Sequence, residues 1–324
     1  MNLATAVYKQ YLESRGIKRR VWRIVREVLV RLFSDPTCAL SVHGKLLKLP
    51  LSHALPYNLE RFPFYDRLPR RLSEFLHKKQ GYLCCIDVGA NVGDTIAAFY
   101  MNDRDAFLAI EPNTTFNKLL SDNWGGHENV TVVSDICSSS NGEDVFAIQE
   151  NKGTASILQA ANGARMSKRT LDEIVSSNPF AANANALKID TDGHDFEVIA
   201  GSEGLLSRNL PAVLFECDAF QNVSYVEDCL KTLDFLKQRG FHYFLLYNNT
   251  GNLMGRHSLS DLAPLRNLLF FQLTSSFEYF DILVMKDEDI HQFYRAEIDY
   301  FVDKMPDKLL QHTAIIAAAL PTRD

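Results

Sequence analysis

The chain has 324 residues, of which 46% are hydrophobic and 23% charged, and its formal net charge is −6. This composition is that of a globular protein with room for one large α/β domain and appendages, and the negative charge argues against a general nucleic-acid-binding protein. No apolar segment approaches the roughly 18 residues of a membrane-spanning helix, and the basic N-terminus lacks the apolar region of a signal peptide. The six cysteines have no metal-binding spacing, so we expect reduced core thiols in a cytoplasmic protein.

Residues 1–80 are expected to form a helical and irregular extension that is a candidate cover for a substrate site. Residues 1–31 carry eight Lys and Arg against two Glu, and apolar residues at helical spacing predict a helix within residues 1–34. Such a basic amphipathic helix can lie on an anionic membrane surface, but we favour a packing arm with a solvated basic face. A small hairpin is predicted to turn at His43 and Gly44, and a helix is predicted over residues 68–79.

From residue 83 onward, strand-like and helix-like segments alternate, which predicts a parallel, doubly wound sheet. Residues 144–158 indicate an inserted hairpin, and Thr170 with Glu173 has the spacing of a helix capping box. A C-terminal helical segment is predicted over residues 290–324. The seven predicted strands are residues 83–87, 106–111, 130–135, 186–190, 212–217, 243–247 and 279–285.

The first strand runs into a glycine turn, Asp-Val-Gly-Ala-Asn-Val-Gly, over residues 87–93. Glycine lets the backbone turn sharply and approach a ligand that a Cβ atom would displace, and the following helix directs its free N–H groups at the turn. In an open α/β sheet, ligands bind beyond the carboxyl ends of the strands. Acidic residues stand at the ends of four predicted strands, namely Asp87, Glu111, Asp135 and Asp190.

The residues of the turn favour one class of nucleoside ligand. Glu111 follows Gly93 by 18 residues, the approximate spacing of a carboxylate that accepts hydrogen bonds from ribose hydroxyls. A pyrophosphate-binding turn would have the pattern G-x-G-x-x-G, but here Asn91 takes the middle position and Asp87 precedes the turn. A carboxylate there suits an ammonium better than a phosphate, which favours S-adenosylmethionine over NAD. Asp135 would then face the adenine amine.

Four segments in this order resemble the FkbM family of S-adenosylmethionine-dependent methyltransferases. They are IDVGANVGD (86–94), AIEPN (109–113), TLDEI (170–174) and LKIDTDGHDFEVIAG (187–201). The resemblance implies a class I methyltransferase domain over residues 81–289, with a seven-stranded, mostly parallel sheet and helices on both faces. It also implies O-methylation of a sugar, glycan or related natural product. By the same resemblance, Asp87, Gly89, Asn91 and Gly93 hold the methionine moiety, Glu111 the ribose and Asp135 the adenine.

Methyl transfer to an alcohol benefits from alignment of the reactants and from a base that removes the hydroxyl proton. His194 is the natural candidate, because its reference pKa lies near neutrality, and Asp190 is its rival. A divalent ion held by Asp190, Asp192 and Glu216 is a further alternative, although we expect no metal. Those residues can instead be structural, as helix-capping or strand-end acids.

Two other functions remain open from the sequence, an NAD-dependent oxidoreductase and a non-catalytic nucleoside-binding scaffold. The expected partner is a small-molecule or glycan acceptor, with no nucleic acid, no membrane span and at most a surface contact through the basic N-terminal helix. The identity of the acceptor and the oligomeric state are not encoded in any motif of this chain.

Overall fold

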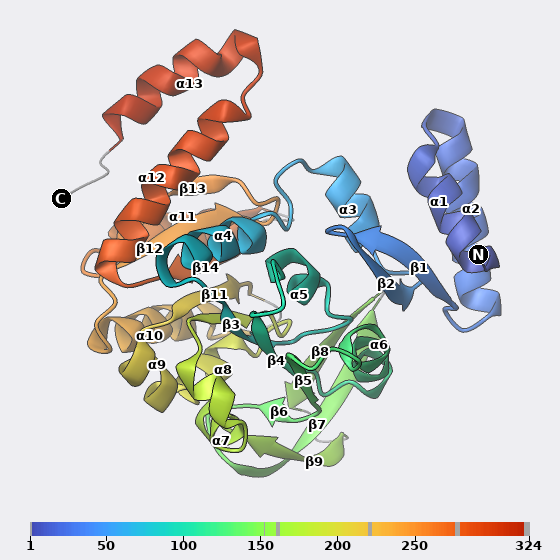
Figure 1. The fold of residues 1–324 in the computed structure, drawn as a ribbon, viewed down its shortest axis with the longest axis horizontal. Helices are drawn as coiled ribbons and strands as arrows, with labels where there is room; N and C mark the ends of the chain where they lie inside the picture. Colours follow the sequence, from blue (N-terminus) through green and yellow to red (C-terminus); the bar gives the residue numbers. More distant parts are fainter. Residues whose placement is uncertain (1, 152, 160–162, 220–221, 276–278, 321–324) are drawn as a thin grey trace.

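In the computed structural model, eight strands form a central sheet with helices on both faces (Figure 1). The structure describes residues 2–151, 153–159, 163–219, 222–275 and 279–320. The sheet holds, in spatial order, β13 (Leu253–Ser258), β12 (Tyr243–Asn248), β14 (Phe280–Val284), β11 (Ala212–Cys217), β10 (Ala186–Ile189), β3 (Cys84–Val88), β4 (Ala106–Ile110) and β5 (Val130–Val133).

The strands of the central sheet are parallel except for β14 and β13, which run in the opposite direction to their neighbours. All neighbouring pairs from β11 to β5 are parallel. β14 runs antiparallel to both β11 and β12, and β13 runs antiparallel to β12. The predicted α/β class is confirmed, with helices on both faces, but the sheet has eight strands and not seven. The additional strand is β13, which lies in the 250–275 region where no motif was found.

The chain reverses its direction of travel across the sheet between β3 and β10. From β3 it moves outward to β4 and β5, and it then returns to the other side of β3 to form β10. Such a switch point leaves a crevice at the carboxyl ends of the two central strands, because their crossover connections leave on opposite sides. The glycine turn follows β3 and the Asp190 segment follows β10, so both meet at this crevice.

Helices on each face bury one of two hydrophobic clusters. One cluster packs α4, α5, α6 and α12 against the sheet, and the other packs α7, α8, α9, α10 and α11 against its opposite face. These helices are α4 (Leu68–Gln80), α5 (Asp94–Phe99), α6 (Thr114–Trp124), α7 (Leu171–Ser176), α8 (Asp195–Ala200), α9 (Glu203–Asn209), α10 (Tyr225–Gln238), α11 (Ala263–Thr274) and α12 (Asp287–Asp303). A 3₁₀ turn spans Pro179–Asn183.

A second, four-stranded sheet is inserted between β5 and β10. Its order is β6 (Ile136–Cys137), β9 (Ala164–Arg169), β7 (Gly142–Asn151) and β8 (Thr154–Gln159). β7 and β8 pair in antiparallel fashion, which confirms the predicted hairpin. The side chain of Thr170 accepts a hydrogen bond from the backbone N–H of Glu173, so the predicted N-cap of α7 is confirmed as well.

The N-terminal extension consists of two hairpins and a short helix. α1 (Leu3–Glu13) and α2 (Gly16–Leu32) pack on each other, so the single predicted helix is broken at Ser14 and Arg15. β1 (Thr37–Val42) and β2 (Lys45–Pro50) form the predicted hairpin, in which His43 and Gly44 have positive φ. α3 (Leu55–Arg61) follows and leads to α4.

The C-terminal helices α12 and α13 (Asp307–Ala319) project from the sheet at the end away from α1 and α2 (Figure 1). They confirm the helical prediction for residues 290–319, whereas residues 321–324 lie outside the described residues. None of the helices in the described part of the chain is both long and apolar enough to cross a membrane. The six cysteines are all buried and free.

Candidate active site

A cavity of about 210 Å³ opens at the carboxyl ends of β3, β4 and β10. Five groups of residues line it: the glycine turn, the strand-end residues Glu111, Asp135 and Asp190, the segment 191–194 after β10, the β7–β8 hairpin, and the segment 53–65 of the N-terminal extension. The extension therefore contributes directly to the site, although its sequence carries no motif for a ligand. The cavity lies where the switch-point argument predicts it.

The two glycines of the turn are required for different reasons. Gly89 has φ +79°, and a Cβ atom there would lie 1.8 Å from the backbone oxygen of Asp190. Gly89 thus allows the turn to lie against the end of β10, beside the cavity that it lines. A Cβ atom on Gly93 would lie 2.3 Å from the indole of Trp124, so Gly93 serves the packing of α5 on α6.

Asp87 is fully buried beneath the cavity and does not line it. Its Oδ1 lies 3.4 Å from Nζ of Lys188, which also lies 3.2 Å from Oδ2 of Asp190. Burial alone would lower the pKa of Lys188, but the carboxylates of Asp190 and Asp87 outweigh it and raise the pKa well above its ordinary value. Asp87 therefore contacts the Lys188–Asp190 pair from below, and its predicted contact with a ligand stays a prediction.

Glu111 joins the end of β4 to the glycine turn. Its carboxylate accepts hydrogen bonds from the backbone N–H groups of Asn91 at 2.9 Å and Asn113 at 2.8 Å. Burial raises the pKa of Glu111 to about 7. Each carboxylate oxygen keeps a second lone pair for a hydroxyl group in the cavity. Asp135 also lines the cavity and is paired with Arg169 at 3.1 Å.

His194 and Asp190 are placed differently with respect to the cavities. His194 lines the first cavity, where its Nε2 lies 3.3 Å from Oγ of Ser138 and its ring meets the edge of Phe146. Burial lowers the pKa of His194, so its imidazole is neutral at neutral pH. Asp190 lines the first cavity and also a second, adjoining one of about 120 Å³. His194 is not part of the lining of the second cavity.

The second cavity is strongly acidic. Asp66, Asp94, Glu216 and Asp281 line it together with Asp190. Burial and the neighbouring acids raise the pKa of Asp281 to about 8 and that of Asp94 to about 7. Oxygens of Asp190, Asp192 and Glu216 lie within 4.8 Å of one another. Burial is the main cause that raises the pKa of Glu216 well above its ordinary value, and the charge of Asp190 is the second. This donor set fits a divalent cation chemically.

His53 is a lining residue that the sequence analysis missed. Its Nδ1 accepts a hydrogen bond from the backbone N–H of Leu55 at 3.2 Å, and burial lowers its pKa to about 4. The imidazole is therefore neutral and carries its proton on Nε2. Neither Nε2 of His53 nor Oδ1 of Asn91 makes a hydrogen bond of good geometry within the described residues, but a contact with the Asn91 side chain partly offsets the lowering of the His53 pKa. The two side chains therefore lie close together, and both line the cavity.

The amide of Asn91 has a fixed orientation, because its Nδ2 donates a hydrogen bond to the backbone oxygen of Gly153 at 2.9 Å. Asn91 itself has φ +47°, a left-handed conformation that asparagine tolerates. The cavity wall thus presents one buried donor, on His53, and one buried acceptor, on Asn91. No sequence signal marks His53, because it precedes the domain and reaches the cavity only through tertiary packing.

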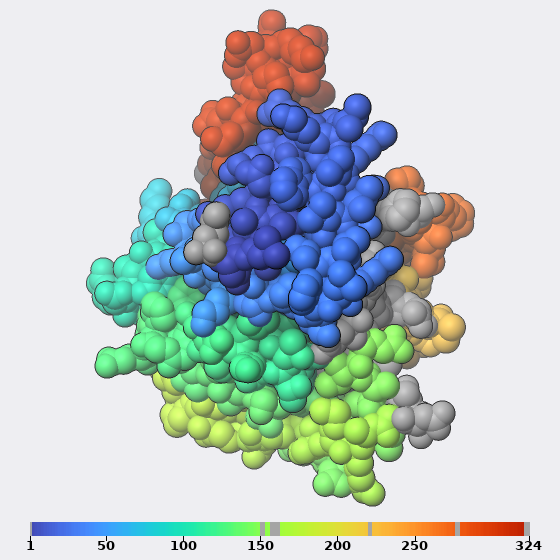
Figure 2. Space-filling view, turned by 90° about the vertical axis from the view of Figure 1, so that its right-hand side faces the viewer, coloured from blue at the N-terminus to red at the C-terminus, as the bar shows by residue number. Residues whose placement is uncertain are grey.

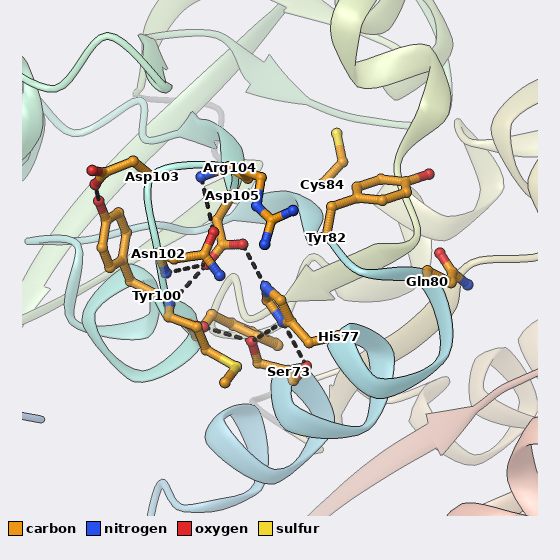
Figure 3. Close-up of polar contacts among 12 residues, drawn as sticks. Ser73, His77, Gln80, Tyr82, Cys84, Tyr100, Asn102, Asp103, Arg104 and Asp105 are labelled. Carbon is orange, nitrogen blue, oxygen red and sulfur yellow. Dashed lines mark hydrogen bonds and ion pairs between the residues drawn. The ribbon is translucent and has the colours of Figure 1, made fainter.

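A second histidine–acid cluster lies at the opposite, amino end of the strands (Figure 3). Nε2 of His77, on α4, lies 2.6 Å from Oδ1 of Asp105, and Nδ1 lies 2.8 Å from the backbone oxygen of Ser73. Oγ of Ser73 donates to the backbone oxygen of Phe99, and the other Asp105 oxygen accepts the N–H groups of residues 101 and 102. Ser73 and Asp105 are fully buried, so this cluster offers no reactive atom to a ligand.

The strand order and the cavity at the switch point define a class I methyltransferase fold. Residues 87–243 match the model of the methyltransferase FkbM domain. This part of the chain belongs to the FkbM methyltransferase family, a family of S-adenosylmethionine-dependent enzymes. The predicted resemblance is thereby confirmed. A search of curated protein sequences gave no significant match.

Several solved structures are similar to this chain at low identity. The methyltransferase FkbM from Methylobacillus flagellatus is 13% identical with a TM-score of 0.36, over 53% of this chain and 44% of that protein. An S-adenosylmethionine-dependent O-methyltransferase from Thermotoga maritima is 14% identical with a TM-score of 0.34, over 67% and 65%. A putative caffeoyl-CoA O-methyltransferase from Staphylococcus aureus is 12% identical with a TM-score of 0.38, over 81% and 99%. The first match thus spans less than half of its protein.

Proposed function

We propose that this protein transfers a methyl group from S-adenosylmethionine to a hydroxyl of a sugar, glycan or related natural product. The observation that carries the proposal is the pair of adjoining cavities at the carboxyl edge of the sheet, which share Asp190. The first has the turn and strand-end residues of a nucleoside site. The second is lined by acids and tyrosines, side chains that suit hydrogen bonding to hydroxyl groups.

The His53 donor and the Asn91 acceptor, which make no good hydrogen bond within the described residues, support an amino-acid ligand over a pyrophosphate. The N–H of His53 matches a carboxylate, and Oδ1 of Asn91 matches an ammonium group. S-adenosylmethionine carries both groups on its methionine end and supplies an electrophilic methyl group when bound. In this proposal His53 and Asn91 hold the amino-acid end, Glu111 accepts the ribose hydroxyls, and Asp135 lies on the adenine side.

Asp190 is the better placed of the two candidates for the base. It faces both cavities, whereas His194 faces only the first and lies beside Ser138. Lys188 holds the Asp190 carboxylate at 3.2 Å, which keeps it oriented between the two cavities. Asp190 would accept the proton of the acceptor hydroxyl, and His194 would line the cofactor side.

A divalent cation is a second candidate for activating the hydroxyl, favoured by the arrangement of Asp190, Asp192 and Glu216. A bound cation would lower the pKa of a coordinated alcohol and relieve the repulsion among these acids. Chelation distinguishes activation by a cation from activation by Asp190 as the base. We expect methyl transfer to survive treatment with EDTA. Activity that disappears with EDTA and returns with Mg²⁺ would instead assign the activation to a cation.

The cofactor and the acceptor are tested separately. Titration calorimetry should detect binding of S-adenosylhomocysteine and none of NAD. The acceptor is then sought with labelled S-adenosylmethionine and extracted glycans and lipids of the source organism. Binding of NAD in place of S-adenosylhomocysteine would support an oxidoreductase. Cofactor binding without any transfer would support a non-catalytic scaffold. We also propose a cytoplasmic location, supported by the six buried, free thiols.

A further inference from the structure

Helix α2 presents an apolar stripe to solvent. Its members are 45% to 79% exposed, although they are the kind of residue that a globular protein buries. At about 100° per residue they fall in one sector of the helix. The stripe consists of Ile17, Val21, Ile24, Val28 and Leu32. Phe33, which is 61% exposed, extends it beyond the helix end.

The opposite face of α2 is the one that packs on the protein. Trp22, Leu29 and Val30 contact the hydrophobic core. The Arg26 guanidinium lies 4.3 Å from the ring centre of Tyr8 and donates to the backbone oxygens of Leu51 and His53. The helix is therefore held in one orientation, and the exposed stripe is the consequence of that orientation.

Basic side chains border the stripe. Lys18, Arg20 and Arg31 are exposed beside it, whereas Arg19 turns inward to pair with Glu60. Residues 1–31 carry a net charge of +6, and the rest of the chain, with 26 basic and 38 acidic residues, carries −12. Figure 2 looks at this side of the molecule, where the blue N-terminal residues form a continuous surface.

We propose that the exposed face of α2 docks on an anionic lipid bilayer, with the apolar stripe inserted at the interface and the basic border among the headgroups. An apolar face flanked by lysine and arginine is the pattern of helices that lie in a membrane interface. A second copy of the chain fits this face less well, because pairing two stripes would bring Lys18, Arg20 and Arg31 of both copies together. Charge complementarity selects an anionic surface.

Docking through α2 would also place the active site close to the bilayer. Arg26 joins the helix to the backbone of residues 51 and 53, and His53 lines the first cavity. The segment from 53 to 65 borders both cavities. An acceptor held at the membrane surface would then lie near the cavities, and this consequence rests on the proposed function, whereas the docking itself does not.

The test is sedimentation of the full-length protein with vesicles of phosphatidylcholine containing roughly a third phosphatidylglycerol. We expect binding to these vesicles, weak binding to pure phosphatidylcholine, and a marked loss at about 0.5 M salt, where the screening length is short. The variant Val21→Ser/Ile24→Ser/Val28→Ser should bind at least about tenfold more weakly, because it removes apolar area from the interface.

Helix α13 supplies a matched control. Its Ile315 and Ile316 are also about two-thirds exposed, but no basic border like that of α2 accompanies them. Ile315→Ser/Ile316→Ser should bind vesicles as the wild type does. Absence of wild-type binding, equal binding to neutral vesicles, or unchanged binding of the α2 variant would overturn the proposal. So would an oligomer that the α2 variant converts to monomers. Circular dichroism and S-adenosylhomocysteine binding verify that the variants are folded.

Discussion

The two ends of the central strands carry similar residues with opposite consequences. At the amino end, His77, Asp105 and Ser73 form a buried cluster in which every polar side-chain atom has a partner (Figure 3). At the carboxyl end, Asp190, Glu111 and His194 line a cavity, and several acids there have raised pKa values. The presence of histidine and aspartate therefore does not by itself identify a ligand site. Satisfaction of hydrogen bonds and access to a cavity distinguish a ligand site from a structural network.

The largest effect is expected from Asp190→Asn at the carboxyl end. Loss of the proton acceptor should lower kcat by about 100-fold or more, with S-adenosylhomocysteine affinity nearly unchanged. Stability should change little, because the neutral side chain loses the ion pair with Lys188 but also relieves repulsion with Glu216 and Asp192. Transfer rates at saturating cofactor and urea unfolding measure the two effects. A kcat within threefold of the wild type would remove Asp190 from the chemistry, and His194→Ala would then be the next variant to measure.

Asp105→Asn tests the amino end. Its carboxylate accepts hydrogen bonds from two backbone N–H groups and contacts His77. Because Asp105 is fully buried, we expect a loss of about 2–3 kcal/mol in the free energy of unfolding and little change in cofactor affinity. Denaturant titration provides the measurement. The exposed neighbour Asp103, changed to Asn, should alter stability by less than about 0.5 kcal/mol. Equal losses in both variants would contradict the comparison.

His53→Asn sharpens the assignment of the first cavity. Asparagine at this position keeps a side-chain acceptor for the N–H of Leu55 but loses the donor at Nε2. Affinity for S-adenosylhomocysteine should fall about tenfold, which corresponds to about 1.4 kcal/mol. Affinity for methylthioadenosine, which lacks the amino-acid end, should stay the same. His53→Gln, which restores an N–H near the Nε2 position, is the control. A parallel loss for both ligands would indicate only a structural role.

The last prediction concerns the change in stability per pH unit. Asp281 has an ordinary pKa of 3.8 that burial and nearby acids raise to about 8 in the folded protein. A raised folded-state pKa means that the folded state binds more protons between these values, so stability decreases as pH rises through that range. Asp281→Asn should weaken this decrease by on the order of 1 kcal/mol per pH unit. Unfolding measured at several pH values reports it, with the exposed Asp299→Asn as control. An unchanged slope in Asp281→Asn would show that the acid does not titrate in this range.

Local sequence patterns accounted for most of the elements. The alternation of strands and helices, the capping of α7 and the β7–β8 hairpin could all be predicted from the sequence, because each depends on residues close together in the chain. The helix break at Ser14 and Arg15 and the strand β13 were not. The helical spacing of apolar residues within 1–34 does not indicate which side of the helix packs on the protein. In α2, Val25 and Leu29 face the protein, whereas Val21, Val28 and Leu32 face solvent.

By itself the sequence determined the family, the α/β class and the edge of the sheet at which the site lies, because strand-end residues and glycine turns are local features. Only the tertiary structure decided what each residue does there. It placed Asp87 beneath Lys188 and Gly93 against Trp124, and it brought His53 from the N-terminal extension into the cavity. It also turned the apolar stripe of α2 outward. These outcomes depend on contacts between segments far apart in the chain, which the spacing of residues does not encode.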